Sequence, residues 1–311
     1  MSDSVVLSEC FVRDGLQHET CFMPTPLKVA LIERFLSLGF PRIEATSFTH
    51  PGNVPQFNDA DEVLRAIPRS KGVGYKATCI NMRSVERAMA ASDAGHGPDE
   101  VSVILCPSDM MSQRAFRRTR AVQHDLIRSM VDGFQGRFTV IGTISFAFGS
   151  PVEAVAPQNV IDDAIWLYRN GVRHLAVADT AGMGTPRSVA EIFKVLRREL
   201  PDAIPIAHFH DTRGLGLTNC LAAYEEGVRH FDCAFGGAGG SPAKINYFEG
   251  YTGNVCTEDL INMFETIGVR TNIDLARLIE TAKFCEESIG RELHGRVTRS
   301  GLGQHTEEKA A

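Results

Sequence analysis

The sequence lacks the features that identify several classes of protein. Its eight cysteines are scattered, with no CxxC pair and no short regular spacing, which argues against a zinc ribbon and a disulfide framework. No run approaches the ~18 uninterrupted apolar residues of a membrane span. The first residues, MSDSVVLSECF, lack a positively charged segment followed by a long apolar one, so we expect no signal peptide. We therefore predict a reduced, cytoplasmic protein that does not cross a membrane.

An excess of positive charge is also missing. The net charge is −6, with 32 Lys and Arg against 38 Asp and Glu. This balance argues against a nucleic-acid partner, because phosphate recognition needs clustered positive charge. The one basic run is QRAFRRTR, residues 113–120. Its ordinary interpretation is a solvated helix face, and contact with the phosphates of a cofactor-like substrate is the alternative.

What the sequence does contain is enough apolar material for a large core. The chain has 311 residues, 43% of them hydrophobic and 23% charged. That length exceeds the usual size of one domain, but single α/β barrels of about 250 residues are common. Short apolar or β-branched runs alternate with longer amphipathic stretches. We expect eight strands, within residues 4–12, 42–48, 72–80, 100–108, 138–148, 174–182, 204–211 and 230–237.

Helical patterns separate most of these strands. In residues 25–40, for example, Leu27, Leu31, Phe35 and Leu38 recur at helical spacing. Strand–helix alternation implies a parallel sheet, and eight units imply a closed (β/α)8 TIM barrel, with a doubly wound open sheet as the less favoured option.

We expect residues 1–311 to form one such catalytic domain. Further helical patterns within about residues 250–300 predict additional helices packed on the outside of the barrel. Residues 302–311 are expected to form a flexible tail.

Two histidines lie on either side of one phenylalanine in PIAHFHDTRGLGLTN, residues 205–219. Residues i and i+2 of a strand point to the same face, so the imidazoles of His208 and His210 should project together. Two nitrogen ligands can reach one metal ion in this way. The alternative is a pair of satisfied polar residues at a strand end.

Other polar residues fall at the predicted strand ends, where (β/α)8 barrels place their chemistry. Each has an ordinary explanation on its own, such as a surface ion pair or a helix cap. Together they supply an arginine, several carboxylates and an amide to the same rim as the two imidazoles. A carboxylate, an amide oxygen and two imidazoles, completed by waters, suit Mg2+ or Mn2+. These residues are Arg13, Asp14, Glu44, Thr46, Ser47, Asp179, Thr180, Asp211 and Asn254.

With these motifs the sequence resembles the 3-hydroxy-3-methylglutaryl-CoA lyases, members of a metal-dependent lyase superfamily of TIM-barrel fold. The resemblance covers nearly the whole chain. Its strongest segments are RDGLQHE (13–19), IEATSF (43–48), DTAGMGTP (179–186), HFHDTRGLGLTN (208–219) and GNVCTEDL (253–260).

The resemblance implies a retro-aldol cleavage of a β-hydroxyacyl-CoA to acetyl-CoA and a keto acid, in an enzyme that commonly forms homodimers. It implies that Arg13 pairs with the thioester oxygen and that Glu44 orients the cluster. We predict that His208 acts as the base. The implied ligands of Mg2+ or Mn2+ are Asp14, His208, His210 and Asn254, and the implied substrate contacts are Arg13, Gln17, Ser47 and Thr180.

One departure from the family concerns the proton that the product enolate needs. The lyases carry a cysteine in a GGCP loop, whereas Ser241 stands here, and a hydroxyl is a far weaker acid than a thiol. The following segment also looks longer and adds Lys244. Tyr247, Glu249 and Cys256 are the candidates for the missing acid. The family resemblance implies hydroxymethylglutaryl-CoA or a related branched dicarboxylic thioester, such as citramalyl-CoA, as the substrate. The loss of the cysteine leads us to expect a thioester other than the namesake, with a group of the longer segment supplying the proton.

Four other interpretations stay open. The same bond chemistry could run in the condensing direction, consuming acetyl-CoA, although such synthases usually carry an added regulatory domain. A metal hydrolase typically places paired histidines near its first strand, and a two-histidine, one-carboxylate iron oxygenase normally uses an all-β scaffold. A non-catalytic relative that keeps the metal would not need an arginine beside it.

Overall fold

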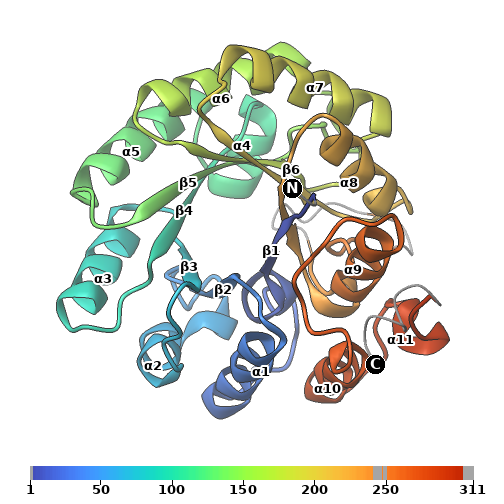
Figure 1. Ribbon diagram of the computed structural model, residues 1–311. Helices are drawn as coiled ribbons and strands as arrows, with labels where there is room; N and C mark the ends of the chain where they lie inside the picture. The colour runs from blue at the N-terminus through green and yellow to red at the C-terminus, as the bar shows by residue number, and fades with distance from the viewer. Residues whose placement is uncertain (1–2, 241–246, 248–250, 304–311) are drawn as a thin grey trace.

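The computed structural model describes residues 3–240, 247 and 251–303, and its eight strands close into a parallel barrel (Figure 1). Each strand pairs with the next along the chain, and β1 closes the ring against β8. The (β/α)8 prediction is therefore confirmed. The strands are β1 Val6–Glu9, β2 Arg42–Ser47, β3 Gly74–Thr78, β4 Glu100–Leu105, β5 Thr139–Ile144, β6 His174–Asp179, β7 Ile204–Phe209 and β8 His230–Cys233.

Helices surround the barrel (Figure 1). The helix predicted over residues 25–40 is α1, Thr25–Leu38, and it ends at Gly39, whose φ of 93° favours glycine. The remaining helices that follow the strands are α2 Ala60–Ala66, α3 Met82–Asp93, α4 Asp109–Phe116, α5 Arg120–Gly133, α6 Pro157–Arg169, α7 Pro186–Glu199 and α8 Gly216–Glu225. Within the described residues, none is long and apolar enough to cross a membrane.

Three further helices follow the barrel: α9 Thr257–Thr266, α10 Leu278–Ile289 and α11 Val297–Ser300. In Figure 1, α9 and α10 lie outside the strands, with α10 beside α1. The buried carboxylate of Glu258 in α9 accepts hydrogen bonds from the backbone N–H of Gly236 and the hydroxyl of Thr298, which ties this region to the barrel wall. The predicted tail lies mostly outside the described residues.

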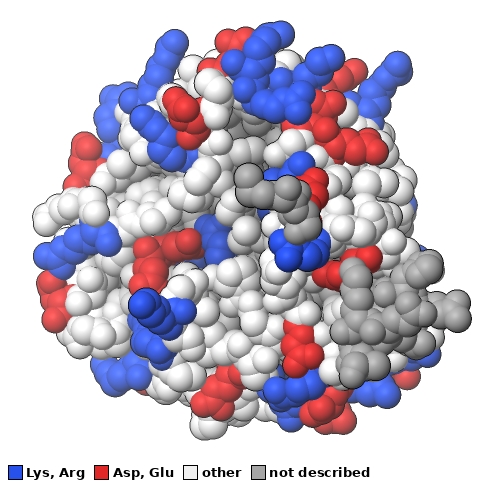
Figure 2. All heavy atoms as spheres, in the orientation of Figure 1, with Lys and Arg blue, Asp and Glu red and all other residues white. Residues whose placement is uncertain are grey.

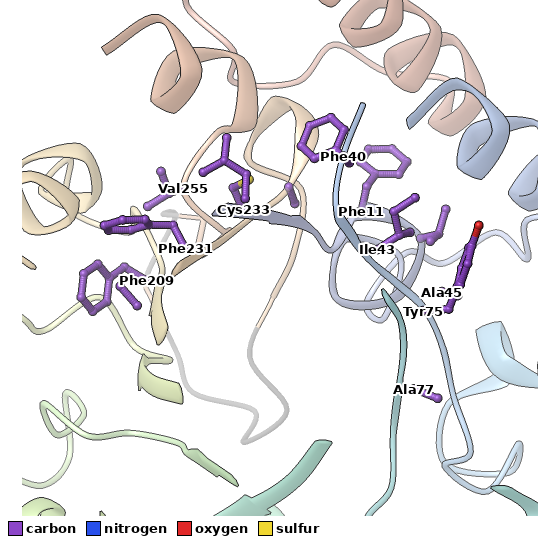
Figure 3. Packing of buried hydrophobic residues seen from close by; sticks show 14 of the residues in the cluster. Phe11, Phe40, Ile43, Ala45, Tyr75, Ala77, Phe209, Phe231, Cys233 and Val255 are labelled. Atoms are coloured by element: carbon purple, nitrogen blue, oxygen red, sulfur yellow. The ribbon is translucent and has the colours of Figure 1, made fainter. Parts of the chain in front are cut away.

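Successive side chains along a strand point alternately to the apolar layer outside the barrel and to the barrel interior. Phe231 and Cys233 of β8 point outward into the apolar layer between strands and helices, as does Phe209 of β7 (Figure 3). Asp232 and His208, which stand between these apolar residues, line the cavity instead. The period of two in a strand therefore separates packing residues from site residues.

The first strand is shorter than predicted. β1 ends at Glu9, and residues Phe11–Gly15 form one π-helical turn. The N–H groups of Arg13, Asp14 and Gly15 all point to the carbonyl of Cys10, at 2.8–3.1 Å. The strand expected within residues 4–12 is therefore present, but the expectation is wrong for its last residues, which begin the turn, and this correction matters for the site. Adjacent strand residues face opposite sides, whereas this turn directs both Arg13 and Asp14 into the cavity.

Candidate metal centre and active site

The mouth of the barrel holds a cavity of about 1090 Å³ at the carboxyl ends of the strands. Polar residues from nearly every strand or the loop after it line this space. On the face shown in Figure 2, positive and negative side chains are interspersed around the edge of the molecule. Small-molecule sites in proteins typically have volumes of about 300–1,000 Å³, so this cavity is large enough for such a ligand.

Asp14, His208 and His210 meet at the base of this cavity, and all three are buried. Oδ2 of Asp14 lies 3.9 Å from Nε2 of His208 and 3.7 Å from Nε2 of His210. Donors about 2.1 Å from an octahedral ion lie roughly 3–4 Å from one another. One oxygen and two imidazole nitrogens therefore stand at the spacing of ligands to a single ion. The imidazoles do project together, as the i, i+2 spacing predicts.

Asn254 completes the predicted ligand group. Its Nδ2 donates to Asp14 Oδ2 at 2.7 Å and to the carbonyl of Ala238 at 2.9 Å. Its Oδ1 is buried and has no hydrogen-bond partner among the described residues. A buried acceptor without a partner costs about 1–3 kcal/mol, so this oxygen is suited to a ligand. Gly239 permits the approach, because a Cβ there would lie 2.5 Å from Asn254 Nδ2.

Arg13 stands directly beside the carboxylate of Asp14 in the candidate metal group, which we define as Asp14, His208 and His210. Its Nη1 lies 2.5 Å from Asp14 Oδ1, and its Nε lies 3.4 Å from Glu44 Oε1. Burial alone would raise the pKa of Asp14. The opposing effect of Arg13 and the two histidines is larger, so the net pKa is lowered and the carboxylate stays ionised. Glu44 also accepts a 2.7 Å hydrogen bond from Thr78 Oγ1. Arg13 and Glu44, two of the residues predicted to be catalytic, are thus in contact.

A second buried pair supports His208. Nδ1 of His208 lies 3.1 Å from Asp232 Oδ2, which assigns the proton to Nδ1 and leaves the lone pair on Nε2, facing Asp14. That lone pair can hold a cation or accept a proton, but not both at once. Burial lowers the pKa of His208, but the hydrogen bond and the charge of Asp232 raise it above its usual value. Nδ1 of His210 instead lies 3.4 Å from the neutral hydroxyl of Thr252, and burial lowers the pKa of His210 to about 4.

The buried Lys76 of β3 joins the two halves of the site. Its Nζ lies 3.2 Å from Asp232 Oδ2 and 3.4 Å from Glu44 Oε2. Neither Lys76 nor Asp232 was predicted from the sequence. A signal was available, because each is a charged residue inside an otherwise apolar strand, in GYKAT and HFDC. Two cations and three carboxylates are therefore packed together, and each charge is paired, as buried charges require.

Of the three other residues predicted to contact the substrate, two line the cavity and one does not. Gln17 and Thr180 line the cavity, and Thr180 Oγ1 also accepts a 3.0 Å hydrogen bond from the N–H of Phe146. Ser47 is buried and does not line the cavity. Its hydroxyl lies 2.7 Å from that of Thr49, which does line it.

The structure describes only some of the residues considered for the missing acid. Ser241, Lys244 and Glu249 lie outside the described residues. Cys256 precedes α9 and is buried away from the cavity, and burial raises the pKa of its thiol well above normal. Tyr247 packs against an apolar cluster that includes Met111 and Phe146.

Part of the basic run lines the cavity. Arg114, Arg117 and Arg118, at the end of α4 and in the turn after it, stand at the rim. Arg118 Nη1 donates to the carbonyl of Ile80 at 3.2 Å, which holds it over the loop after β3. The run is therefore more than a solvated helix face, and its guanidinium groups are positioned to meet an anionic ligand.

Comparison with known proteins agrees with this geometry. The family model described as HMGL-like matches residues 4–285. The chain is 34% identical to a mouse mitochondrial hydroxymethylglutaryl-CoA lyase, over 95% of this chain and 89% of that protein. Among solved structures, a Bacillus subtilis HMG-CoA lyase is 32% identical, with a TM-score of 0.89 over 96% of this chain and 99% of the other. An Acinetobacter baumannii HMG-CoA lyase, solved with coenzyme A and 3-methylmalate, is 36% identical, with a TM-score of 0.90 over 98% and 97%.

Proposed function

The chain belongs to the HMGL-like family and is a carbon–carbon lyase of the hydroxymethylglutaryl-CoA lyase type, and on this premise we propose that it is a divalent-metal-dependent enzyme. The proposed reaction is the retro-aldol cleavage of a β-hydroxyacyl-CoA to acetyl-CoA and a keto acid. The observation that supports it best is the convergence of Asp14, His208 and His210 directly beside Arg13.

The chain's residues suit the charges that develop in this cleavage. Breaking the bond leaves an electron pair on the carbon next to the thioester, which is delocalised onto the thioester oxygen as an enolate. Arg13 is fixed between Asp14 and Glu44, so its guanidinium can meet that oxygen without reorganising. A cation held by the four predicted ligands would act as a Lewis acid on the substrate oxygens. Because its single free lone pair cannot serve both roles at once, we give His208 the ligand role. The role of base, which was predicted from the sequence, would require His208 to be free of the cation.

We propose hydroxymethylglutaryl-CoA or a related branched dicarboxylic thioester, such as citramalyl-CoA, as the substrate. The cavity offers Gln17 and Thr180 as neutral polar contacts and the arginines after α4 as anion contacts. A CoA thioester with a free carboxylate carries negative charge at both ends, which suits a basic rim. The relative solved with coenzyme A and 3-methylmalate supports a thioester substrate of this kind. The eight free cysteines fit a reducing compartment, and we propose a cytoplasmic location.

A coupled assay for acetyl-CoA release tests this function. The protein is incubated with a panel of β-hydroxyacyl-CoA thioesters, with Mg2+ or Mn2+ and in parallel with excess chelator. We expect metal-dependent release from one branched dicarboxylic thioester. Consumption of acetyl-CoA with a keto acid, and no release across the panel, would instead favour the condensing direction. No turnover in either direction would contradict an enzymatic role.

A further inference from the structure

The proposed cleavage needs a proton donor that none of the described predicted residues supplies. When the carbon–carbon bond breaks, the enolate carbon must receive a proton to become the methyl group of acetyl-CoA. An efficient donor titrates near neutral pH and stands in the cavity, within reach of that carbon. The inference below rests on the proposed function, because it assigns this donor.

The described residues that line the cavity leave few choices. Cysteine and tyrosine are absent from them. Asp14, His208 and His210 form the metal group, and Glu44, Lys76 and Asp232 are paired with one another and with Arg13 or His208. The remaining arginines keep their charge in proteins and do not donate protons. His18 is the one other titratable residue of the described lining.

His18 stands at the mouth of the cavity, on the segment that follows the π-helical turn. Gln17 Nε2 lies 3.2 Å from His18 Nε2, and half a turn of the Gln17 amide would present its oxygen to a protonated imidazole instead. A Cβ on Gly240 would lie 2.3 Å from His18 Cδ2, so the imidazole packs directly against this glycine. The side chain reaches over the cavity and is nonetheless exposed to solvent, from which it can regain a proton.

The charges around His18 come from the metal group and its own segment. Burial against the cavity wall lowers the pKa of His18, Asp14 and Glu19 oppose that change, and Arg13 adds to it. His18 also contributes to the low pKa of His210, so the two imidazoles are within electrostatic reach. A lowered pKa makes the imidazolium a stronger acid than free histidine.

We propose that His18 is the catalytic acid that protonates the enolate carbon. The carbon–carbon bond breaks and its electron pair becomes the enolate, while the hydroxyl proton leaves to solvent water and the hydroxyl carbon becomes the carbonyl of the keto acid. The imidazolium of His18 then gives its N–H proton to the enolate carbon and becomes neutral. Solvent returns a proton to His18, so one proton leaves and one enters in each cycle, which balances without a co-reactant.

The test is the His18→Ala variant of the full chain, assayed with and without added imidazole. We expect kcat for acetyl-CoA release to fall at least 100-fold, the typical contribution of a general acid, with KM changed less than threefold. Free imidazole in the emptied space should restore kcat at least tenfold. His50→Ala is the matched control, because His50 is an exposed histidine of the loop after β2 whose Nδ1 accepts a 3.0 Å hydrogen bond from the backbone N–H of Gly52. It should keep kcat within twofold and show no response to imidazole.

A second measurement separates this inference from the proposed function. Metal-loaded wild-type protein in D2O should exchange the methyl hydrogens of acetyl-CoA, detected by NMR, whichever acyl group it cleaves. His18→Ala should exchange them at least 100-fold more slowly while its Mn2+ affinity and thermal midpoint stay at the wild-type values. Wild-type cleavage and exchange that survive in His18→Ala would overturn the role of His18 alone. Neither cleavage nor exchange in the wild type would overturn the proposed function and this inference together.

Discussion

Lys76 and His208 meet at a single oxygen atom, Oδ2 of Asp232, at 3.2 and 3.1 Å. Hydrogen bonds thereby connect residues of β3, β7 and β8, which are far apart in the sequence, to the proposed metal ligand His208. The net effect of Lys76 and His208 is to lower the pKa of Asp232, although burial alone would raise it. A permanently ionised Asp232 fixes the tautomer and orientation of His208, as outer partners of metal-binding histidines commonly do.

We predict that Lys76→Met lowers Mn2+ affinity about tenfold, because Asp232 loses the cation that keeps it ionised. Titration calorimetry measures the affinity. Lys28→Met is the matched control, since Lys28 is also buried and pairs with Asp59 at 2.6 Å, but outside the cavity. Both variants should lose about 3 kcal/mol of unfolding free energy, the usual cost of breaking a buried ion pair. Equal Mn2+ affinity in the two variants would refute the link from Lys76 to the metal.

Asn254→Ala should weaken Mn2+ binding at least tenfold, because it removes one predicted ligand oxygen and a hydrogen bond to Asp14. Asn219→Ala serves as the control, since Asn219 is likewise buried and its Oδ1 has no hydrogen-bond partner in the part of the chain that the structure describes, but it lies on α8 and does not line the cavity. Its Mn2+ affinity should equal that of the wild type. A similar loss in both variants would indicate a general packing effect rather than a ligand.

Arg13→Gln should lower kcat by about 10²–10³, the usual loss on removing one donor to a developing oxyanion. Binding of the thioester in the ground state should change less, because the charge on the thioester oxygen develops only during bond cleavage. Steady-state kinetics over a substrate range separates kcat from KM. If KM alone rises, Arg13 binds substrate and transition state equally, and its proposed role is wrong.

The buried carboxyl group of Glu9 leads us to predict that the stability of the fold depends on pH. Its carboxylate accepts hydrogen bonds from the N–H groups of Phe11 and Phe235 and from the hydroxyl of Thr257. Burial, the largest influence, nevertheless raises its pKa from 4.5 to about 8. The folded state therefore holds a proton that the unfolded chain has lost between pH 4.5 and 8, so this group destabilises the fold as pH rises through that window.

The Glu9→Gln variant should remove this dependence. Urea unfolding at pH 5 and pH 8 gives the stability of each protein, and the difference between wild type and variant cancels the other titrating groups. We expect the wild type to lose up to about 3 kcal/mol more than the variant over this range. Equal losses in the two proteins would show that Glu9 is ionised in the fold throughout.

Much of the site could be predicted from local rules. The period of two in a strand placed His208 and His210 on one face, and the carboxyl-end rule for barrels brought Glu44 and Asn254 to the same rim. Both rules act through the backbone and need no knowledge of neighbouring side chains. For the same reason, the outward packing of Phe209 follows from its position between the histidines.

The remaining parts depend on long-range contacts. The first strand was predicted to run through Val12, because the β-branched pattern continues, but the carboxylate of Glu9 and the carbonyl of Cys10 capture the following N–H groups. Lys76 and Asp232 are 156 residues apart, and only closure of the barrel reveals that they pair. His18 follows RDGLQ in a segment without strong periodicity, so its place in the lining of the cavity was not predicted.

The central claim is that one divalent cation is held at the mouth of the barrel. Anomalous diffraction from a crystal soaked in Mn2+, recorded at the manganese edge, tests it most directly. We predict a single strong peak about 2.1–2.3 Å from Asp14 Oδ2 and from Nε2 of both His208 and His210, with Asn254 turned to present Oδ1. A fully occupied peak elsewhere, or no peak at this position at saturating Mn2+, would contradict the metal centre and the cleavage chemistry built on it.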